Sequence, residues 1–167
     1  LMLANHTQLL LKAYQCYKKL EGEDSFDNFI GTAEVLINDY SELDLQLVDT
    51  DSFFYNLEKL QSMKVYEPGS DALSEYSQRF VAFWKLFRNL YEELKETLLQ
   101  DGLAYRGMIY KHVANVVDSK LRLNLEWRNR SCYFVGFNAL ARSEKEILNA
   151  IKGVATVEVV SDADAYY

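Results

Sequence analysis

The residues best placed to do chemistry lie near the C-terminus, at the end of an apolar run over residues 132–137. Such a run predicts a strand buried on both faces, as in a parallel sheet. In nucleotide-hydrolysing folds a strand of this kind ends in the acid that binds Mg²⁺, beside a second acid that orients the attacking water. Here the strand ends in Val135, Gly136 and Phe137, with Asn138 next. These residues predict a nucleotide-handling architecture without the chemistry.

The other polar candidates are isolated. The chain has no GxxxxGK[ST] loop to hold phosphates, so no cofactor is predicted. His6 and His112 have no second metal ligand at helical spacing, which favours structural roles. Cys16 and Cys132 are far apart in sequence and belong to no CxxC or Cys/His group. We interpret them as two buried thiols, with a disulfide as the alternative.

Two acidic segments resemble metal sites in composition. Asp162 and Asp164 follow the last predicted strand, a place where carboxylates can bind a metal in open α/β sheets. We interpret this pair as a solvated loop, with a metal-dependent hydrolase as the remote alternative. The acidic stretch 39–51 lacks the glycine that a calcium-binding loop needs at its turn. It is therefore predicted to be a solvated helix face, and no metal site is assigned.

An aromatic stripe runs through residues 76–91 and is interleaved with Arg79, Lys85 and Arg88. Aromatic rings between cations can stack on unpaired bases. At helical spacing, however, the rings fall on one side and the cations mostly on the other. We therefore expect the rings, Phe83 among them, to form the core of a bundle.

Composition limits the possible functions. The chain has 167 residues, 49% of them hydrophobic, and a net charge of −7. Its apolar runs are much shorter than the ~20 residues that cross a bilayer, and no secretion signal is present, so a cytoplasmic location is expected. Acids and bases are interspersed, which argues against tight nucleic-acid binding by this chain alone. A role on DNA or RNA would need neighbouring domains.

Apolar residues at three- and four-residue spacing predict a mainly helical N-terminal region. Gly31 indicates a close approach of another backbone, Asp51 is expected to cap a helix, and Gly102 to end one. The only proline, Pro68, marks a turn at 67–71. Asp24 or Ser25 can cap the second helix. The predicted helices span residues 7–21, 26–40, 41–48 (one or two turns), 51–60, 71–100 and 104–118.

The spacing of apolar residues changes after residue 118. Residues 120–128 alternate apolar and polar, which is typical of a half-exposed strand or extended arm. Ser143 and Glu146 predict a capping box for a helix that ends at Gly153, between strands at 132–137 and 154–160. The short links favour a right-handed crossover with parallel strands. The fold class is thus mainly α with a small C-terminal α/β part, and we expect the rest of its sheet to lie outside this chain.

Several short motifs resemble a middle section of AddB-type proteins. These are the helicase-like subunits of AddAB and RecBCD-type helicase-nucleases, whose full chains also carry a PD-(D/E)XK nuclease domain. The matching motifs are Ser25-Phe26-Asp27-Asn28-Phe29, Val35-Leu36-Ile37-Asn38-Asp39-Tyr40, Leu47-Val48-Asp49, Gly102-Leu103-Ala104-Tyr105-Arg106-Gly107-Met108 and Tyr133-Phe134-Val135-Gly136-Phe137-Asn138-Ala139-Leu140.

The resemblance implies a helical accessory (1B-like) region over 1–118 and a partial RecA-like segment over 119–167. It places Val135 and Gly136 at the acidic pair of helicase motif II, Phe137 at its aromatic residue and Asn138 at its glutamine. A degenerate motif II of this kind implies no ATP hydrolysis here. It also implies double-strand break repair, with DNA and an AddA-type helicase-nuclease subunit as partners of the full-length protein.

A second hypothesis belongs to another class. The chain would be a self-contained helical protein-interaction module whose apolar groove binds a partner helix. Its C-terminal strands would then form a small dimerising sheet. The sequence on either side of this chain distinguishes the two hypotheses.

Overall fold

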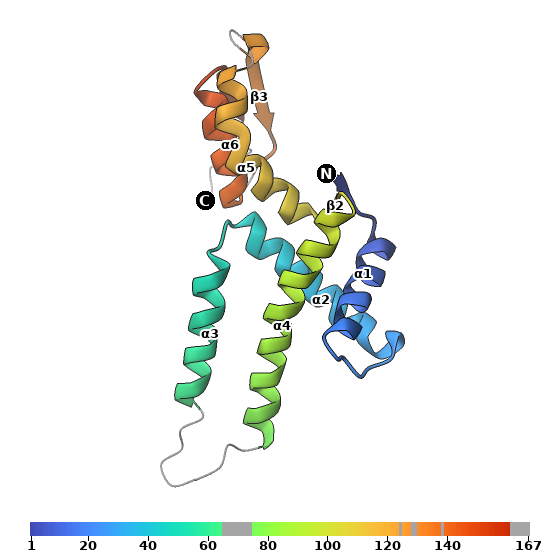
Figure 1. Ribbon diagram of the computed structural model, residues 1–167. Helices are drawn as coiled ribbons and strands as arrows, with labels where there is room; N and C mark the ends of the chain where they lie inside the picture. The colour runs from blue at the N-terminus through green and yellow to red at the C-terminus, as the bar shows by residue number, and fades with distance from the viewer. Residues whose placement is uncertain (65–74, 124, 128–129, 138, 161–167) are drawn as a thin grey trace. The chain divides into compact units, whose positions relative to one another are not determined.

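A computed structural model of the chain describes residues 1–64, 75–123, 125–127, 130–137 and 139–160 (Figure 1). They divide into two compact units, unit 1 (residues 1–43 and 48–105) and unit 2 (residues 44–47 and 106–167). Helices dominate, as predicted, and the strands are short. None of the helices in these ranges has the length and apolar character needed to cross a membrane. The turn predicted around Pro68 lies outside the described residues.

Unit 1 is built from helices that are joined at one end by a small parallel strand pair. Asn5 and Gln8 cap the first helix reciprocally, with Oδ1 of Asn5 2.9 Å from the Gln8 N–H. Gly102 ends the long fourth helix with a φ of +69°, as the sequence predicted. The elements are β1 (Met2–Leu3), α1 (His6–Lys19), α2 (Phe26–Leu45), α3 (Thr50–Lys64), α4 (Glu75–Gln100) and β2 (Leu103–Ala104).

The core of unit 1 lies along α4, which packs against α1 and α3 (Figure 1). Apolar side chains at helical spacing on α1, α2 and α4 meet there because each helix has one apolar stripe to bury. The Tyr40 hydroxyl donates a hydrogen bond of 2.7 Å to the Phe87 carbonyl and so ties α2 to α4. The buried residues of this core include Leu10, Ala13, Tyr17, Phe29, Ala33, Leu36, Tyr40, Phe54, Phe87, Leu90, Tyr91, Leu94 and Leu98.

Three local predictions in unit 1 were wrong. Residues 41–45 continue α2 and do not form a separate helix, and Asp44, four residues after Tyr40, is fully buried. Asp49 caps α3 in place of Asp51, and its Oδ2 accepts a 2.6 Å hydrogen bond from the Ser52 hydroxyl. The Phe83 side chain is 41% exposed, so it lies at the edge of the aromatic stripe and not in its core.

Alanine substitutions at two glycines of unit 1 should change stability in opposite directions. An added Cβ at Gly31 meets no atom within 4 Å, which corrects the expected close approach of another backbone. At Gly22 the Cβ would lie 2.3 Å from the ring of Tyr17, which stacks on Phe29 at 4.1 Å and cannot move freely. Gly31→Ala should therefore stabilise the protein by about 1 kcal/mol, and Gly22→Ala should destabilise it by about 1–3 kcal/mol.

Urea unfolding followed by circular dichroism measures both changes in the free energy of unfolding. The wild-type chain is the common reference. Equal effects of the two substitutions would contradict this description of α2 and of the turn that precedes it.

Unit 2 contains the strand, helix and strand that the sequence predicted. Its elements are α5 (Arg106–Leu123), the 3₁₀-helix η1 (Leu125–Trp127), β3 (Ser131–Val135), α6 (Arg142–Lys152) and β4 (Thr156–Val160). The strand predicted over 120–128 was wrong, because α5 continues to Leu123 and η1 follows it. Val113, Val117 and Leu121 repeat every four residues, and Leu121 is buried, so the helical period decides this segment.

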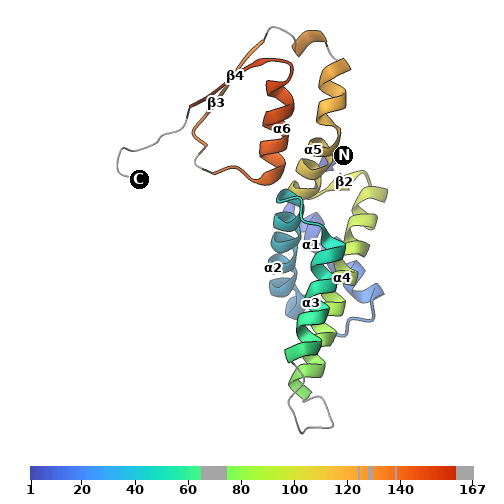
Figure 2. The ribbon, with the colours of Figure 1, turned by 90° about the vertical axis from the view of Figure 1, so that its left-hand side faces the viewer.

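The strands β3 and β4 pair in parallel from Ser131 opposite Thr156 to Val135 opposite Val160 (Figure 2). This confirms the predicted parallel pair with α6 between its strands. The expected burial of the first strand on both faces was wrong for these residues. The exposed fraction is 63% for Tyr133 and 66% for Val135, so one face of the pair is open.

Candidate functional site

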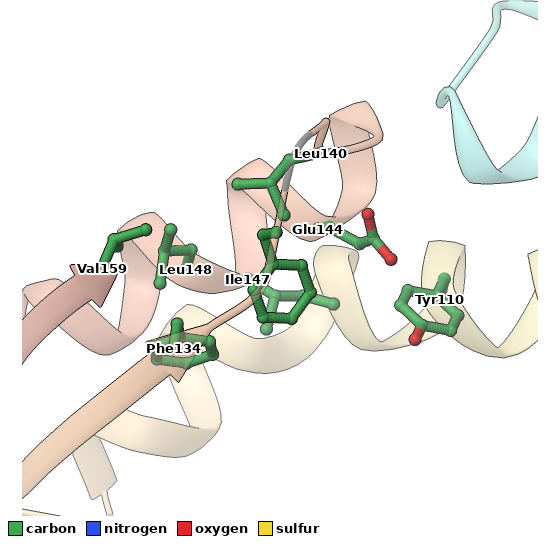
Figure 3. Close-up of a pocket in the computed structure, with 8 residues that line it drawn as sticks. Tyr110, Phe134, Leu140, Glu144, Ile147, Leu148 and Val159 are labelled. Atoms are coloured by element: carbon green, nitrogen blue, oxygen red, sulfur yellow. The ribbon is translucent and has the colours of Figure 1, made fainter. Parts of the chain in front are cut away.

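The candidate site is a pocket of about 210 Å³ in unit 2 (Figure 3). It lies among α5, the inner face of the β3–β4 pair, Phe137 and Leu140, and α6. Most of its lining is hydrocarbon. The residues that line it are Tyr110, Phe134, Phe137, Leu140, Glu144, Ile147, Leu148 and Val159.

The apolar wall follows from the strand register. Phe134 and Val159 are partners across the parallel pair, so their side chains lie on the same face. Leu148 of α6 lies beside them (Figure 3). The rings of Phe134 and Phe137 are 6.2 Å apart, a spacing typical of aromatic pairs. This wall can bury a small nonpolar group. Among the described residues, its lining side chains include no cation that could bind a phosphate.

The opposite end of the pocket carries its polar groups, Tyr110 and Glu144 (Figure 3). Oε2 of Glu144 accepts a 2.9 Å hydrogen bond from the Ala141 N–H, and its Oε1 lies 3.7 Å from the Arg106 guanidinium. That guanidinium also lies over the Tyr110 ring, 5.4 Å from its centroid. The carboxylate is therefore held in place by the start of α6 and by α5.

The Glu144 contact also corrects the predicted start of α6. Ala141 is the N-cap, and Glu144 makes the return bond that was assigned to Glu146. Ser143 lies inside the first turn and is fully buried, so it does not cap the helix. The N-cap was predicted two residues too far along the chain, because serine is a preferred N-cap residue. Gly153 is the C-cap, as predicted.

The structure describes three of the four positions that were predicted to form a degenerate motif II. Val135 ends β3 and is exposed, and Gly136 follows it with a φ of +82°. Phe137 is partly exposed and lines the pocket. Asn138 lies outside the described residues. Only one of the positions that the structure describes, Phe137, therefore belongs to the candidate site.

The isolated candidates stay apart from the pocket. His6 is exposed, and its Nε2 lies 3.1 Å from Oε1 of Glu34. His112 is exposed on α5. Asp162 and Asp164 lie outside the described residues. Within the part of the chain that the structure describes, no group of three or more His, Cys, Asp or Glu residues is arranged to hold a metal.

The two cysteines are free thiols, and only Cys16 is buried as predicted. Burial raises the pKa of Cys16, which disfavours the nucleophilic thiolate. Its Sγ is 3.4 Å from the Thr97 hydroxyl oxygen. Cys132 is half-buried on the inner face of β3.

Sequence reasoning missed the polar end of the site. Arg106 and Tyr110 are four residues apart at the start of α5, a spacing that places them on one face of a helix. Glu144 stands three residues after Ala141, where a glutamate can return a bond to the N-cap. Both signals are present in the sequence, but nothing in it indicates that α5 and α6 bring these residues together.

Comparisons of the chain with protein-family models, with curated proteins and with solved structures found no match in any of the three.

Proposed function

We propose that this chain is a non-catalytic structural segment of a degenerate superfamily 1 helicase-like subunit of the AddB type, which acts in double-strand break repair. The helical unit serves as an accessory region that shapes a DNA channel and contacts an AddA-type partner subunit. Unit 2 contributes strands to a RecA-like sheet. The proposal rests on the sequence motifs quoted above and on the strand end described here.

The end of β3 is the observation that carries the proposal. A working motor needs a carboxylate there to bind Mg²⁺ and a second one to orient water. Val135 has no oxygen in its side chain. The backbone at Gly136 has a φ of +82°, a conformation that costs an L-residue such as glutamate roughly 1–2 kcal/mol. Phe137 contributes to an apolar pocket. Both side chains and backbone thus favour a structural role for this strand end.

The open face of the β3–β4 pair supports the second part of the proposal. Parallel sheets are normally covered on both faces. Here Tyr133, Val135 and Val160 lie on one face and are each at least half exposed. Further strands beside this pair, and helices over that face, would bury these side chains. A RecA-like sheet supplies both.

The proposal predicts that the purified chain neither turns over ATP nor cleaves DNA. Phosphate release is measured with and without DNA, and cleavage of linear duplex is measured with Mg²⁺ and with Mn²⁺. A working superfamily 1 helicase and a metal-dependent nuclease serve as positive controls. Rates equal to those of buffer are expected, and robust activity in either assay would overturn the assignment.

The gene around this segment provides the positive test. We expect its reading frame to encode a phosphate-binding loop before this segment and a PD-(D/E)XK nuclease motif after it. The full-length product should process duplex ends only together with its AddA-type partner. A reading frame that lacks both the phosphate-binding loop and the nuclease motif would contradict the helicase-like assignment.

Within the described residues β3 and β4 pair only with each other. Their unpaired edges favour a second candidate, a helical interaction module that dimerises through these strands. Sedimentation equilibrium of the chain distinguishes it. Unpaired strand edges invite pairing between copies, and a lysine on the strand opposes it. A dimer that the substitution Val160→Lys dissociates, together with a reading frame that lacks helicase and nuclease motifs, would support this candidate.

A further inference from the structure

We propose that the pocket of unit 2 is a binding site for one neutral aromatic ring of about the size of benzene. This inference rests on the cavity alone and is independent of the proposed role in DNA repair. It concerns residues that belong to a single compact unit.

The size of the cavity sets the size of its ligand. Pockets for drug-sized molecules and cofactors measure roughly 300–1,000 Å³. At about 210 Å³ this pocket is too small for a nucleotide. An engineered protein cavity of about 150 Å³ lined by Leu, Ile and Phe stays dry and binds benzene. A pocket of about 210 Å³ therefore has room for a single aromatic ring.

The lining selects a ring without charge. Phe134, Leu148 and Val159 offer only carbon atoms (Figure 3). The Glu144 carboxylate at the far end would repel an anion. Both of its oxygens face groups of the protein, the Ala141 N–H and the Arg106 guanidinium, so a ligand cation would compete with these for it. Neutral hydrocarbon is the chemistry that matches this surface.

A nucleobase has a ring of suitable size, but its edge carries polar groups that do not match the apolar wall. Its carbonyl and amide groups would lose water against the wall of Phe134, Leu148 and Val159, which has no hydrogen-bonding side chain. A polar group buried without a hydrogen bond costs about 1–3 kcal/mol. The rings of Phe134 and Phe137 favour an aromatic over an aliphatic ligand, because edge-to-face and offset contacts add to the gain from burial.

The test is a titration of the full 167-residue chain with benzene, followed by methyl resonances in nuclear magnetic resonance spectra. Saturable shifts are expected for the methyl groups of Ile147, Leu148 and Val159, with nuclear Overhauser effects from the benzene protons to the same groups. The methyl groups of Leu10 and Leu36 in unit 1 should not shift. Benzoate and thymidine, an anionic and a polar ring, should give no saturable shift.

Two neighbouring substitutions give a matched control. Val159→Phe places a ring in the pocket and should abolish the saturable shifts. Val160→Phe makes the same change on the opposite face of β4 and should leave them intact. Circular dichroism checks that both variants fold. If Val159→Phe does not fold, Leu140→Phe fills the cavity from the preceding segment and takes its place.

Three results would each overturn the inference: no saturable shift with benzene, equal binding by the Val159→Phe and wild-type chains, or thymidine binding in preference to benzene. The contacts in the wild-type protein are read directly from the Overhauser effects. The result therefore does not depend on any variant or on the test of the DNA-repair assignment.

Discussion

Replacing Tyr40 with alanine should destabilise the protein by about 4 kcal/mol, since truncation of a fully buried aromatic side chain costs roughly 3–5 kcal/mol. Tyr40 has no exposed surface. Its ring contacts those of Phe87 and Tyr91, with centroids 4.8 and 5.2 Å away, and its hydroxyl donates to the Phe87 carbonyl. The substitution thus removes a buried link between α2 and α4.

Urea unfolding followed by circular dichroism measures this loss. Tyr40→Phe keeps the ring and removes only the hydrogen bond, so it should cost about 1 kcal/mol. Tyr55→Ala is the matched control on α3, where the side chain is 52% exposed, and it should cost less than about 1 kcal/mol. Similar losses at positions 40 and 55 would show that α2 and α4 do not pack as described.

The Tyr40 hydroxyl also predicts a dependence of stability on pH. Burial raises the pKa of Tyr40 above its ordinary value of 10.0, and the negative charge of Asp39 adds to the effect. Above pH 10.0 the unfolded chain therefore releases a proton that the folded chain keeps. The contribution of this group is fully present below that pH and falls by about 1.4 kcal/mol per pH unit above it.

Tyr40→Phe removes the hydroxyl and with it this pH-dependent contribution to the free energy of unfolding. Between about pH 9 and pH 11 the free energy of unfolding of the wild-type chain should fall more steeply than that of the variant. Parallel curves over this range would contradict burial of the neutral hydroxyl.

Replacing Lys111 with methionine is the second large change, with an expected loss of about 3 kcal/mol, because it removes a partner from a buried charge. Asp44 has no exposed surface, and its Oδ1 lies 2.8 Å from Nζ of Lys111. A carboxylate cannot remain charged in a dry interior at low cost without such partners. The pair holds residues 44–47 against α5 within unit 2.

The control for charge removal is Lys120→Met on the same helix. Lys120 is exposed, so its substitution should change stability by less than about 0.5 kcal/mol. The double variant Asp44→Leu with Lys111→Met replaces the whole pair by hydrocarbon and should recover most of the loss. Thermal unfolding of the three variants checks this order. A double variant less stable than Lys111→Met alone would contradict the description of the pair.

The sequence was sufficient to predict local structure wherever a single physical signal acts. The four-residue spacing in α1, α2 and α4 predicted their buried faces, because a helix turns its side chains by a fixed angle. Gly102 predicted the end of α4 because its left-handed backbone suits glycine. The parallel pairing of β3 with β4 followed from the short links around α6.

The sequence failed where two local signals compete. Residues 120–123 fit an alternating pattern and also continue the four-residue repeat of Val117 and Leu121, and packing of the helix decided between them. Ser143 is the best capping residue by type, but Ala141 and Glu144 form the cap. Phe83 fits the aromatic stripe, but its position at the edge leaves it exposed.

By itself, the sequence determined a mainly helical chain with a final strand, helix and strand, and a strand end without a carboxylate. Only the tertiary structure decided that Tyr110 and Glu144 line one pocket with Phe134 and that Arg106 lies close to the Glu144 carboxylate. The physical reason is that periodicity fixes which side of one element is apolar. The volume left between elements depends on how several such sides fit together, and no local pattern encodes it.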